Sequence, residues 1–339
     1  MLKLKRFKIM AILLAMMVIF TFTLVGCSGQ EKPVSESEKG KSEQANSKYP
    51  EGPITVIVSY AAGGGTDVGA RILQPFAEKE LGTSLVIVNK PGGGGWVGWS
   101  ELAKAKPDGY TIGFINTPNL MAGYLDPKLK RKENLNSFIP IINQVTDYGA
   151  IAVRPDSKFK TIQDVIKYAK ENPGKLSVTS TGYGSDDHIA ALKLAEAIGS
   201  KFEIIHLNGA ADSRAQVLGG HVDILFANVG EVTTLHKEGQ LRVLAVMSEK
   251  RSEFLPDVPT LKEIGYDIVS ASARGIAAPA GTPQEIIDFL QDKLEKAIKN
   301  PEHIKKMAQQ GLAVIPIKGD EYMKLLKKDE ADVKKYMGW

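Results

Sequence analysis

The sequence predicts an α/β protein built of two lobes, each a sheet flanked by helices, with a cleft between them. Short β-branched runs alternate with helical patterns from residue 53 onward, which is typical of a parallel sheet with helices on both faces. The alternation restarts after Asp147, and a further helical segment follows near the C-terminal end. About 290 residues follow the N-terminal leader and tether, a length that is large for one core and ordinary for two lobes.

The first set of elements lies between residues 53 and 115. Apolar, β-branched runs in this region predict strands, and glycine-rich stretches follow the first two of them. Thr66 and Asp67 open a helical pattern, because apolar residues then recur on one face. The expected elements are strands at 54–58, 84–88 and 110–115, a helix with Val68, Ile72, Leu73 and Phe76 on one face, and a short helix at 100–104.

The second set begins at residue 151 and predicts a second group of parallel strands. Asp164 follows Thr161 by three residues, a spacing typical of a helix start. Residues 282–285 read as a capping box, with Pro283 at the first helical position. The expected elements are strands at 151–153, 176–179, 202–206, 222–227 and 241–247, and helices at 161–170, 187–198 and from 283, the last with Ile286, Leu290, Leu294 and Ile298 on one face.

These two sets define the expected domain boundaries. We expect residues 49–150 to form the first part of lobe 1 and residues 151–271 to form lobe 2. Residues 272–339 then return to lobe 1 and add C-terminal helices. A return of the chain implies two crossings between the lobes, and therefore a hinge beside the cleft.

The N-terminal residues have the features of an export signal. Lys3, Lys5, Arg6 and Lys8 precede an apolar run that is shorter than the roughly 20 residues of a bilayer span. Residues 24–27, Leu-Val-Gly-Cys, resemble a bacterial lipobox, so we expect a signal peptide at 1–26 and lipidation of Cys27. The alternative is a plain membrane anchor. Residues 27–48 are rich in Ser, Glu and Lys, which predicts a lipid-bearing flexible tether.

Charge and cysteine content exclude several classes of function. Cys27 is the only cysteine, so its lipidation would leave no thiol for a disulfide, a metal ligand or a nucleophile. The formal charge of +4 becomes zero when the four basic residues of the signal are removed (4 − 4 = 0). A neutral chain offers no basic patch for nucleic acid. Beyond residue 27, no run is long and apolar enough to span a membrane.

Two glycine-rich loops are the strongest candidate binding elements. Residues 60–67 follow the first predicted strand, and residues 90–96 follow the second. Ligands of open parallel sheets bind beyond the carboxyl ends of the strands. Glycines at such a position let backbone N–H groups turn toward an anion, and a helix start adds favourable partial charge. The alternative is that these glycines only form tight turns, and that Asp67 only caps its helix.

Other motifs do not indicate an enzyme, a cofactor or a metal site. Gly93, Gly95 and Gly98 match a dinucleotide fingerprint, but Trp96 stands where a pyrophosphate would approach. The five histidines are scattered, and no phosphate loop, nucleophile elbow or zinc helix is present. A hydrolase would have only Ser185 near His188, with no third member. We therefore expect no catalytic residue, no metal and no cofactor.

Eight segments in order resemble the substrate-binding proteins of tripartite tricarboxylate transporters, the Bug or TctC-like family. The resemblance covers residues 49–317. The matching segments are YAAGGGTDVGAR (60–71), NKPGGGG (89–95), KPDGYT (106–111), NPGKL (172–176), TGYGSDDH (181–188), LGGHVDILF (218–226), LPDVPT (255–260) and AAPAGTP (277–283).

The resemblance implies a two-lobed periplasmic-binding-protein fold of type II-like topology that closes around a ligand. It implies that residues 61–67 and 92–95 hold a ligand carboxylate through main-chain N–H groups and bridging waters, and that residues 181–188 and 208–209 complete the site on closure. The candidate ligand-binding residues are Tyr60, Ala62, Gly63, Gly64, Gly65, Thr66, Asp67, Gly93, Gly94, Gly95, Trp96, Thr117, Tyr148, Thr181, Gly182, Ser185, His188, Asn208, Gly209 and Asn228.

Departures from the family pattern bear on the ligand. The family usually has Pro at the position of Ala62 and a small or polar residue at that of Trp96. Asn228 stands near a position where an acid is common, which disfavours an amino-acid ligand. Tyr60, Trp96, Tyr148 and Tyr183 could stack on an aromatic acid, or could simply pack. The expected ligand is first a di- or tricarboxylate, second an aromatic carboxylate, and third an amino acid.

The resemblance also implies a partner and a location. We expect a monomer, lipid-anchored at the cell membrane and facing outside the cytoplasm, that delivers its ligand to separate permease subunits. The alternatives are a surface carboxylate sensor and, less favoured, a cell-surface hydrolase.

Overall fold

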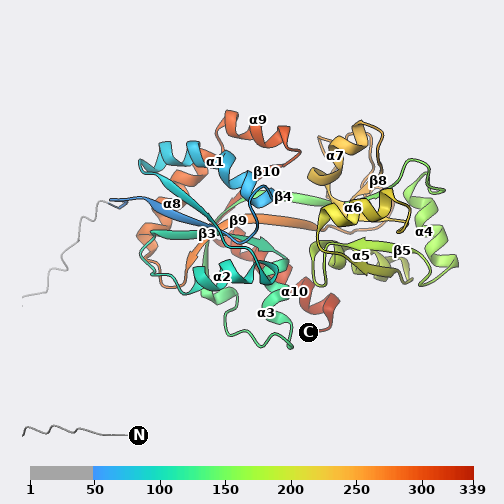
Figure 1. Cartoon of the computed structure of the whole chain (residues 1–339), viewed down its shortest axis with the longest axis horizontal. Coiled ribbons are helices and arrows are strands. Elements are labelled where there is room, and N and C mark those ends of the chain that lie inside the picture. Colours follow the sequence, from blue (N-terminus) through green and yellow to red (C-terminus); the bar gives the residue numbers. More distant parts are fainter. Residues whose placement is uncertain (1–48) are drawn as a thin grey trace, which may run out of the picture. The chain divides into compact units, whose positions relative to one another are not determined.

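The computed structural model describes residues 49–339. The predicted signal peptide, the predicted lipidation site Cys27 and the tether to residue 48 lie outside the described residues. Within the described part, no helix combines the length and the apolar character needed to cross a membrane. The described residues form two sheets that share one long strand (Figure 1).

The first sheet is mixed, in the strand order β10-β4-β9-β3-β1-β2. Strand β1 pairs in parallel with β2 and with β3. Strand β9 runs antiparallel to both β3 and β4, and β10 runs antiparallel to β4. The strands are β1 (Ile54–Val58), β2 (Leu85–Asn89), β3 (Thr111–Thr117), β4 (Phe138–Val153), β9 (Ala271–Pro279) and β10 (Val314–Lys318).

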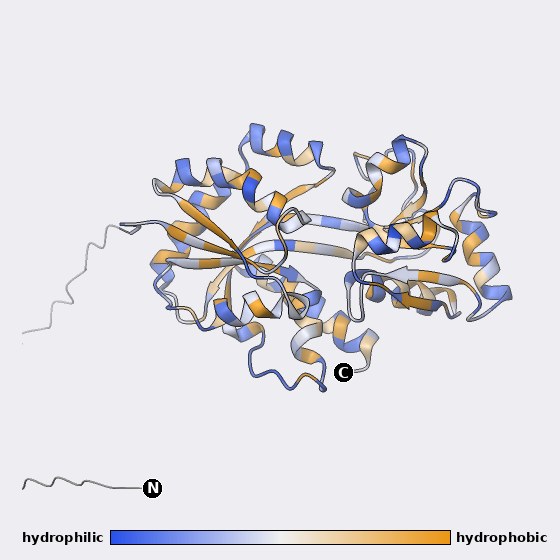
Figure 2. Cartoon of the chain, in the orientation of Figure 1, coloured by the Kyte–Doolittle hydropathy of each residue, from blue (hydrophilic) through white to orange (hydrophobic). Residues whose placement is uncertain are grey.

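Helices cover both faces of this sheet, which explains the continuous apolar runs of its strands. In β1, Val56 and Val58 pack toward α1 and α8, whereas Ile57 packs toward α2, α3 and α10. Figure 2 shows apolar colour along these strands and polar colour on the helices around them. The helices are α1 (Gly65–Leu81), α2 (Trp96–Ala103), α3 (Asn119–Leu125), α8 (Gln284–Ile298), α9 (Pro301–Gln309) and α10 (Gly319–Met337), with short 3-10 turns at Gly93–Gly95 and Leu135–Ser137.

The second sheet is built on the last residues of β4. Residues 149–153 of β4 pair antiparallel with β7 and β8. Strand β5 parallels β6, and the N–H of Thr179 donates to the carbonyl of Ile224 at 2.9 Å, which joins β5 to the segment entering β7. The elements are β5 (Ser177–Ser180), β6 (Glu203–His206), β7 (Leu225–Asn228), β8 (Arg242–Val246), α4 (Ile162–Glu171), α5 (Asp186–Ile198), α6 (Ala210–Leu218) and α7 (Val229–Lys237).

The expectation of parallel sheets is confirmed for β1 to β3 and for β5 with β6, but it is wrong for β4 and its neighbours, which pair antiparallel. Strand β4 is 16 residues long, although only its last three residues were expected as a strand. Its first part contains Asn143 and Gln144, polar residues that obscure the strand signal. Both are buried and hydrogen-bonded: Asn143 donates to Ile315 O at 2.9 Å, and Gln144 donates to Gly69 O at 3.1 Å. Strand β9, which also runs between the lobes, is rich in small residues and carried no strand signal either.

The two expected helix starts have different outcomes. The Thr161 hydroxyl accepts the N–H of Asp164 at 3.2 Å, and the Asp164 carboxylate accepts the N–H of Thr161 at 2.8 Å, so the capping box of α4 is confirmed. The predicted capping box at 282–285 is wrong. Pro283 is the N-cap of α8, and the Thr282 hydroxyl donates to Pro279 O at 2.9 Å because the chain turns tightly before the helix.

Candidate functional site

The predicted site residues gather at the carboxyl ends of parallel strands. Because β1, β2 and β3 run in parallel, the loops that follow them lie at one edge of the first sheet. In the second lobe, residues 181–185 follow β5, Asn208 and Gly209 follow β6, and Asn228 ends β7. Tyr148 is the exception, since it lies within β4.

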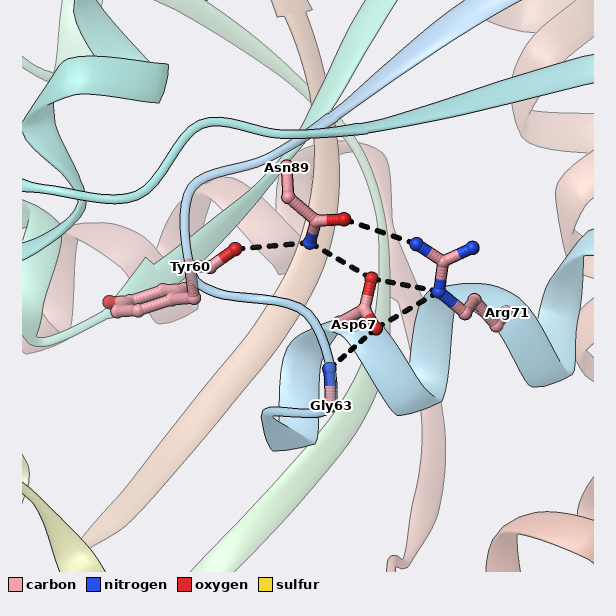
Figure 3. Close-up of polar contacts among 5 residues, drawn as sticks. All are labelled: Tyr60, Gly63, Asp67, Arg71 and Asn89. Carbon is pink, nitrogen blue, oxygen red and sulfur yellow. Dashed lines mark hydrogen bonds and ion pairs between the residues drawn. The ribbon is translucent and has the colours of Figure 1, made fainter.

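The loop after β1 is held by Asp67, as Figure 3 shows. The Asp67 carboxylate accepts the N–H of Gly63 at 2.8 Å, Nε of Arg71 at 3.0 Å and Nδ2 of Asn89 at 2.9 Å. Asn89 Nδ2 also donates to Tyr60 O at 3.0 Å, which ties the loops after β1 and β2 together. Burial alone would raise the pKa of Asp67, but hydrogen bonds from Arg71, Gly63 and Asn89 lower it below its usual range. Asp67 is thus a buried loop anchor.

Asp67 holds the base of this loop, and the tip of the loop stays exposed where a ligand can reach it. Residues 61–65 are exposed, and Gly63 has a φ of 81°. Gly64 has a φ of −72°, so it does not require glycine on conformational grounds. Gly65 and Thr66 begin α1, where N–H groups have no intrahelical acceptor. This geometry suits an anion.

The loop after β2 is an almost continuous left-handed turn. Gly92, Gly93, Gly94 and Gly95 have φ values of 119°, 57°, 66° and 103°. The N–H of Gly95 closes the turn on Gly92 O at 3.0 Å. Gly92, Gly93 and Gly94 are exposed, whereas a Cβ on Gly95 would lie 2.6 Å from the ring of Trp99. The loop therefore uses Gly95 for packing and exposes the others.

The aromatic residues mostly pack inside the protein. Trp96 is 2% exposed and packs edge-on against Trp99 and Tyr124, with Arg131 4.7 Å over its ring. Tyr60 packs edge-on against Trp99 as well. Of the four candidates for stacking, Tyr183 is the freely exposed one, at 60%. Trp96 is therefore buried, with Arg131 over its ring.

A pocket of about 210 Å³ brings part of the predicted site together. Its walls include Gly93, Gly94 and Trp96 from the first lobe, and Thr181, Gly182 and Ser185 from the second. Helix α3 also contributes, and a Cβ on Gly184 would lie 2.8 Å from that of Ala122. A larger pocket of about 340 Å³ contains only Tyr148 of the predicted residues. The smaller pocket lies between the loops after β2 and β5, so it forms one part of the candidate site.

Several predicted residues do not line this pocket, including Tyr60, residues 62–67 and Gly95. Asn208 is exposed, Gly209 is partly exposed, and Asn228 and His188 are buried. Thr117 is fully buried, and its hydroxyl donates to Asp329 of α10 at 2.5 Å. That contact gives Thr117 a structural partner away from the loops.

Ser185 and His188 shape the second-lobe loop. The Ser185 hydroxyl caps α5 by accepting the N–H of His188 at 3.3 Å, and His188 Nδ1 accepts the N–H of Gly184 at 3.0 Å. Burial, and then His206, lower the pKa of His188 to about 4, so the ring is neutral at pH 7. Because Nδ1 is occupied by a backbone donor, this nitrogen does not serve as a base for Ser185.

A buried charged cluster beside the loops was not predicted from the sequence. It consists of Asp147 on β4, Arg274 on β9, Asp186 at the start of α5, and Glu231 on α7. Asn228 Nδ2 donates to Asp186 at 2.7 Å, and the N–H of Gly230 donates to Asp147 at 3.0 Å. Burial raises the pKa of all three acids, that of Glu231 to about 7 with help from Asp147 and Asp186. An arginine inside the small, apolar run of residues 271–279 was the signal that could have pointed to the cluster.

The described residues hold no group of three or more His, Cys, Asp or Glu side chains arranged to bind a metal ion. The acids of the cluster face an arginine and amide donors instead.

Comparison with known proteins gives a consistent picture. Residues 69–337 match the family described as the tripartite tricarboxylate transporter family receptor. The UPF0065 protein in the gbd 5' region of Cupriavidus necator is 35% identical over 297 residues, covering 85% of this chain and 88% of the relative.

Two solved structures extend the comparison. A TctC solute binding protein from Polaromonas, without ligand, is 34% identical, with a TM-score of 0.75 over 86% of this chain and 99% of that one. An R. palustris protein solved with adipate is 25% identical, with a TM-score of 0.72 over 86% and 98% of the two chains. The two-lobed periplasmic-binding fold and the resemblance to the TctC-like family are thereby confirmed.

Proposed function

Because this chain belongs to the tripartite tricarboxylate transporter receptor family, we propose that it captures a small carboxylate between its lobes and delivers it to a membrane permease. The observation that carries the proposal is the glycine-rich loop after β2, whose Gly93 and Gly94 face residues 181–185 across one pocket. The exposed glycine-rich loop after β1 is tied to this loop through Asn89. Family and neighbours are solute-binding receptors, which favours a role without catalysis.

Main-chain donors are suited to a carboxylate. The exposed loop at 61–65 leads into the free N–H groups of the first turn of α1, and the exposed glycines at 92–94 lie in the neighbouring loop. A carboxylate accepts such N–H bonds and gains from the positive end of the helix dipole. Closure of the second lobe then excludes water. The ligand shifts the balance toward the closed form by the amount by which it binds the closed form more tightly than the open one.

The ligand that we favour is an amine-free di- or tricarboxylate. The R. palustris neighbour was solved with adipate, a dicarboxylate. Trp96 is 2% exposed and has Arg131 over its ring, which weakens the case for stacking on an aromatic acid. Residue 228 is an asparagine, so this position supplies no carboxylate of its own to a ligand ammonium group.

The proposed setting is the outer side of the cytoplasmic membrane, with lipid on Cys27 as the anchor and permease subunits as the partner. Lobe 1 comprises residues 49–150 and 272–339, and lobe 2 comprises residues 151–271. The crossing strands β4 and β9 support these boundaries. Strand β4 pairs with β9 in the first sheet and then ends in the second sheet, whereas β9 begins beside the second sheet and then pairs in the first.

A thermal-shift screen tests the proposal. Residues 49–339 would be heated with adipate, succinate, citrate, tartrate, terephthalate, nicotinate and glutamate. A ligand at 100 times its dissociation constant stabilises the fold by about 2.7 kcal/mol, a readily visible shift. We expect one or more di- or tricarboxylates to stabilise the protein and to be recovered chemically unchanged. A flat response of folded protein, with no ligand carried through purification, would refute carboxylate capture.

A further inference from the structure

Arg274 is a buried arginine whose hydrogen-bonding capacity is largely unused. It lies on β9 directly across from Asn116 on β3, and it is 9% exposed. Its Nη2 lies 3.4 Å from the Asp147 carboxylate. Its Nη1 is buried and has no hydrogen-bond partner among residues 49–339. A guanidinium that served only as a counter-ion would typically form two short contacts of about 2.7–2.9 Å with its carboxylate.

The unused nitrogen lies immediately behind the first glycine-rich loop. A Cβ built on Gly65 would be 3.3 Å from Arg274 Nη1, so the glycine allows the guanidinium to approach the loop backbone. Gly65 itself is exposed. The Asn116 amide donates to the Thr66 hydroxyl at 2.8 Å, while its Oδ1 is buried without a partner in the described part of the chain. A free donor and a free acceptor therefore lie under the same exposed turn.

This arrangement is costly unless something completes it. A buried charge with incomplete hydrogen bonding destabilises the fold, and a natural protein keeps such a group where it has a use. Acidic side chains nearby are already in excess, with Asp147, Asp186 and Glu231 around one arginine. The guanidinium therefore needs no further acidic side chain from the protein. It lacks an acceptor that can reach it from the side of Gly65.

We propose that Arg274 is the specificity-determining cation of the site, and that it pairs with a carboxylate of the ligand when the lobes close around it. This inference rests on the proposed function and adds a side-chain contact to the main-chain donors of the loops. Asp147 competes with the ligand for the guanidinium, and its contact of 3.4 Å is longer than a strong ion pair that the ligand would have to displace. Asn116 Oδ1 accepts a hydroxyl of ligands that carry one.

The test compares single and paired variants by calorimetry, using adipate and the strongest acid from the thermal screen as probes. Arg274→Met should weaken binding at least tenfold. Asp147→Asn should leave binding intact or make it two- to tenfold tighter, because the competing charge is gone while the amide oxygen still accepts the N–H of Gly230. The double variant Arg274→Met/Asp147→Asn removes both charges, so neither is left buried without its counter-charge. Its affinity therefore reports the loss of the arginine from binding and not a loss of stability. The double variant should fold and still bind weakly.

Each result decides between the two roles of Arg274. Recovery of wild-type affinity in the double variant would show a purely structural counter-ion and overturn the inference, while carboxylate capture stands. If the double variant does not fold, the single variant Asp147→Asn decides. Weaker ligand binding by this variant overturns the inference, and tighter binding supports it. If the unaltered protein binds no carboxylate at all, the proposed function and this inference fail together.

Discussion

Two neighbouring glycines in the first binding loop have different requirements. Gly63 has a φ of 81°, in the left-handed region where a side chain is strained, and open space surrounds its Cβ position. Gly64 is extended, with a φ of −72°, so its backbone would accept alanine. The sequence predicted backbone donors in both loops, but it did not show which glycines the backbone requires. That distinction depends on φ, which composition does not reveal.

Alanine at a left-handed loop glycine should weaken ligand binding. Gly63→Ala and Gly94→Ala each place a side chain at positive φ without a packing clash. The strain of about 1–2 kcal/mol is relieved when the loop leaves the conformation that presents its N–H groups. We expect binding of the acid from the screen to weaken roughly five- to thirtyfold, measured by calorimetry.

Gly82→Ala is the matched control for these variants. Gly82 has a φ of 72° and open space, but it caps the far end of α1. It should lower stability with unchanged affinity. Equal affinity for all three variants and the unaltered protein would contradict a main-chain binding site.

At the scale of elements, local sequence signals identified most helices, whereas the extent and direction of the strands depend on pairing with segments distant in sequence. The helix α4 has its cap, its amphipathic face and its end within one short segment. Strand β4 has no such local signature, because polar residues such as Asn143 are satisfied by partners distant in sequence. Small residues in β9, including the buried Ala273, pack between two strands that the sequence alone could not place beside them. This is why two parallel sets were predicted where the structure has mixed sheets.

The capping box of α4 should contribute measurably to stability. In Thr161→Ala the N–H of Asp164 loses its acceptor at the helix start. Loss of such a cap costs about 1 kcal/mol, which corresponds to a fall in Tm of roughly 2–4 °C. Thr161→Ser retains the hydroxyl and should restore most of the difference. If both variants melt at the same temperature as the unaltered protein, the cap does not stabilise the second lobe.

At the scale of the whole molecule, the C-terminal helix α10 connects the two lobes beside the crossing strands. Toward the first lobe, Asp329 accepts from Thr117 and Glu330 accepts from Tyr124 at 2.8 Å. Toward the second lobe, Lys193 of α5 donates to Asp332 at 2.6 Å. The sequence predicted C-terminal helices for this segment, but no contact between them and the second lobe. Acids of α10 make contacts in both directions, and its Lys335 also pairs with Glu196 of α5 at 2.9 Å. These contacts could be recognised only once the lobes were placed together.

The candidate site was predictable to the extent that it depends on local chain geometry. The glycine loops and the 181–185 loop follow strand ends that the sequence located, and Gly93 and Gly94 share a pocket with the 181–185 loop. The charged cluster was not predictable, because Asp147, Asp186, Glu231 and Arg274 come from four separate elements. Folding brings them together beside the crossing strands, where burial changes their protonation.

This cluster should give the protein a pH-dependent stability that Glu231→Gln removes. Burial, Asp147 and Asp186 raise the pKa of Glu231 from 4.5 to about 7, whereas Asn228 and Arg274 oppose the shift. A carboxyl whose pKa is higher in the folded state binds more protons when folded, so its contribution falls as pH rises from about 4.5 to 7 and stays low above that. At about 1.4 kcal/mol per pKa unit, the loss is on the order of 3 kcal/mol.

Urea unfolding at pH 5, 6, 7 and 8 measures this effect as a difference between variant and unaltered protein. The difference matters because the low pKa of His188 acts in the opposite sense, removing stability as pH falls from 6.5 toward about 4. Glu231→Gln retains His188, so its advantage over the unaltered protein should grow with pH up to about 7 and then level off. Glu238→Gln, an exposed change one residue beyond the end of α7, should show no such trend. A pH-independent difference for Glu231→Gln would mean that Glu231 stays ionised in the folded protein, with Arg274 neutralising more of the cluster than the long contact to Asp147 suggests.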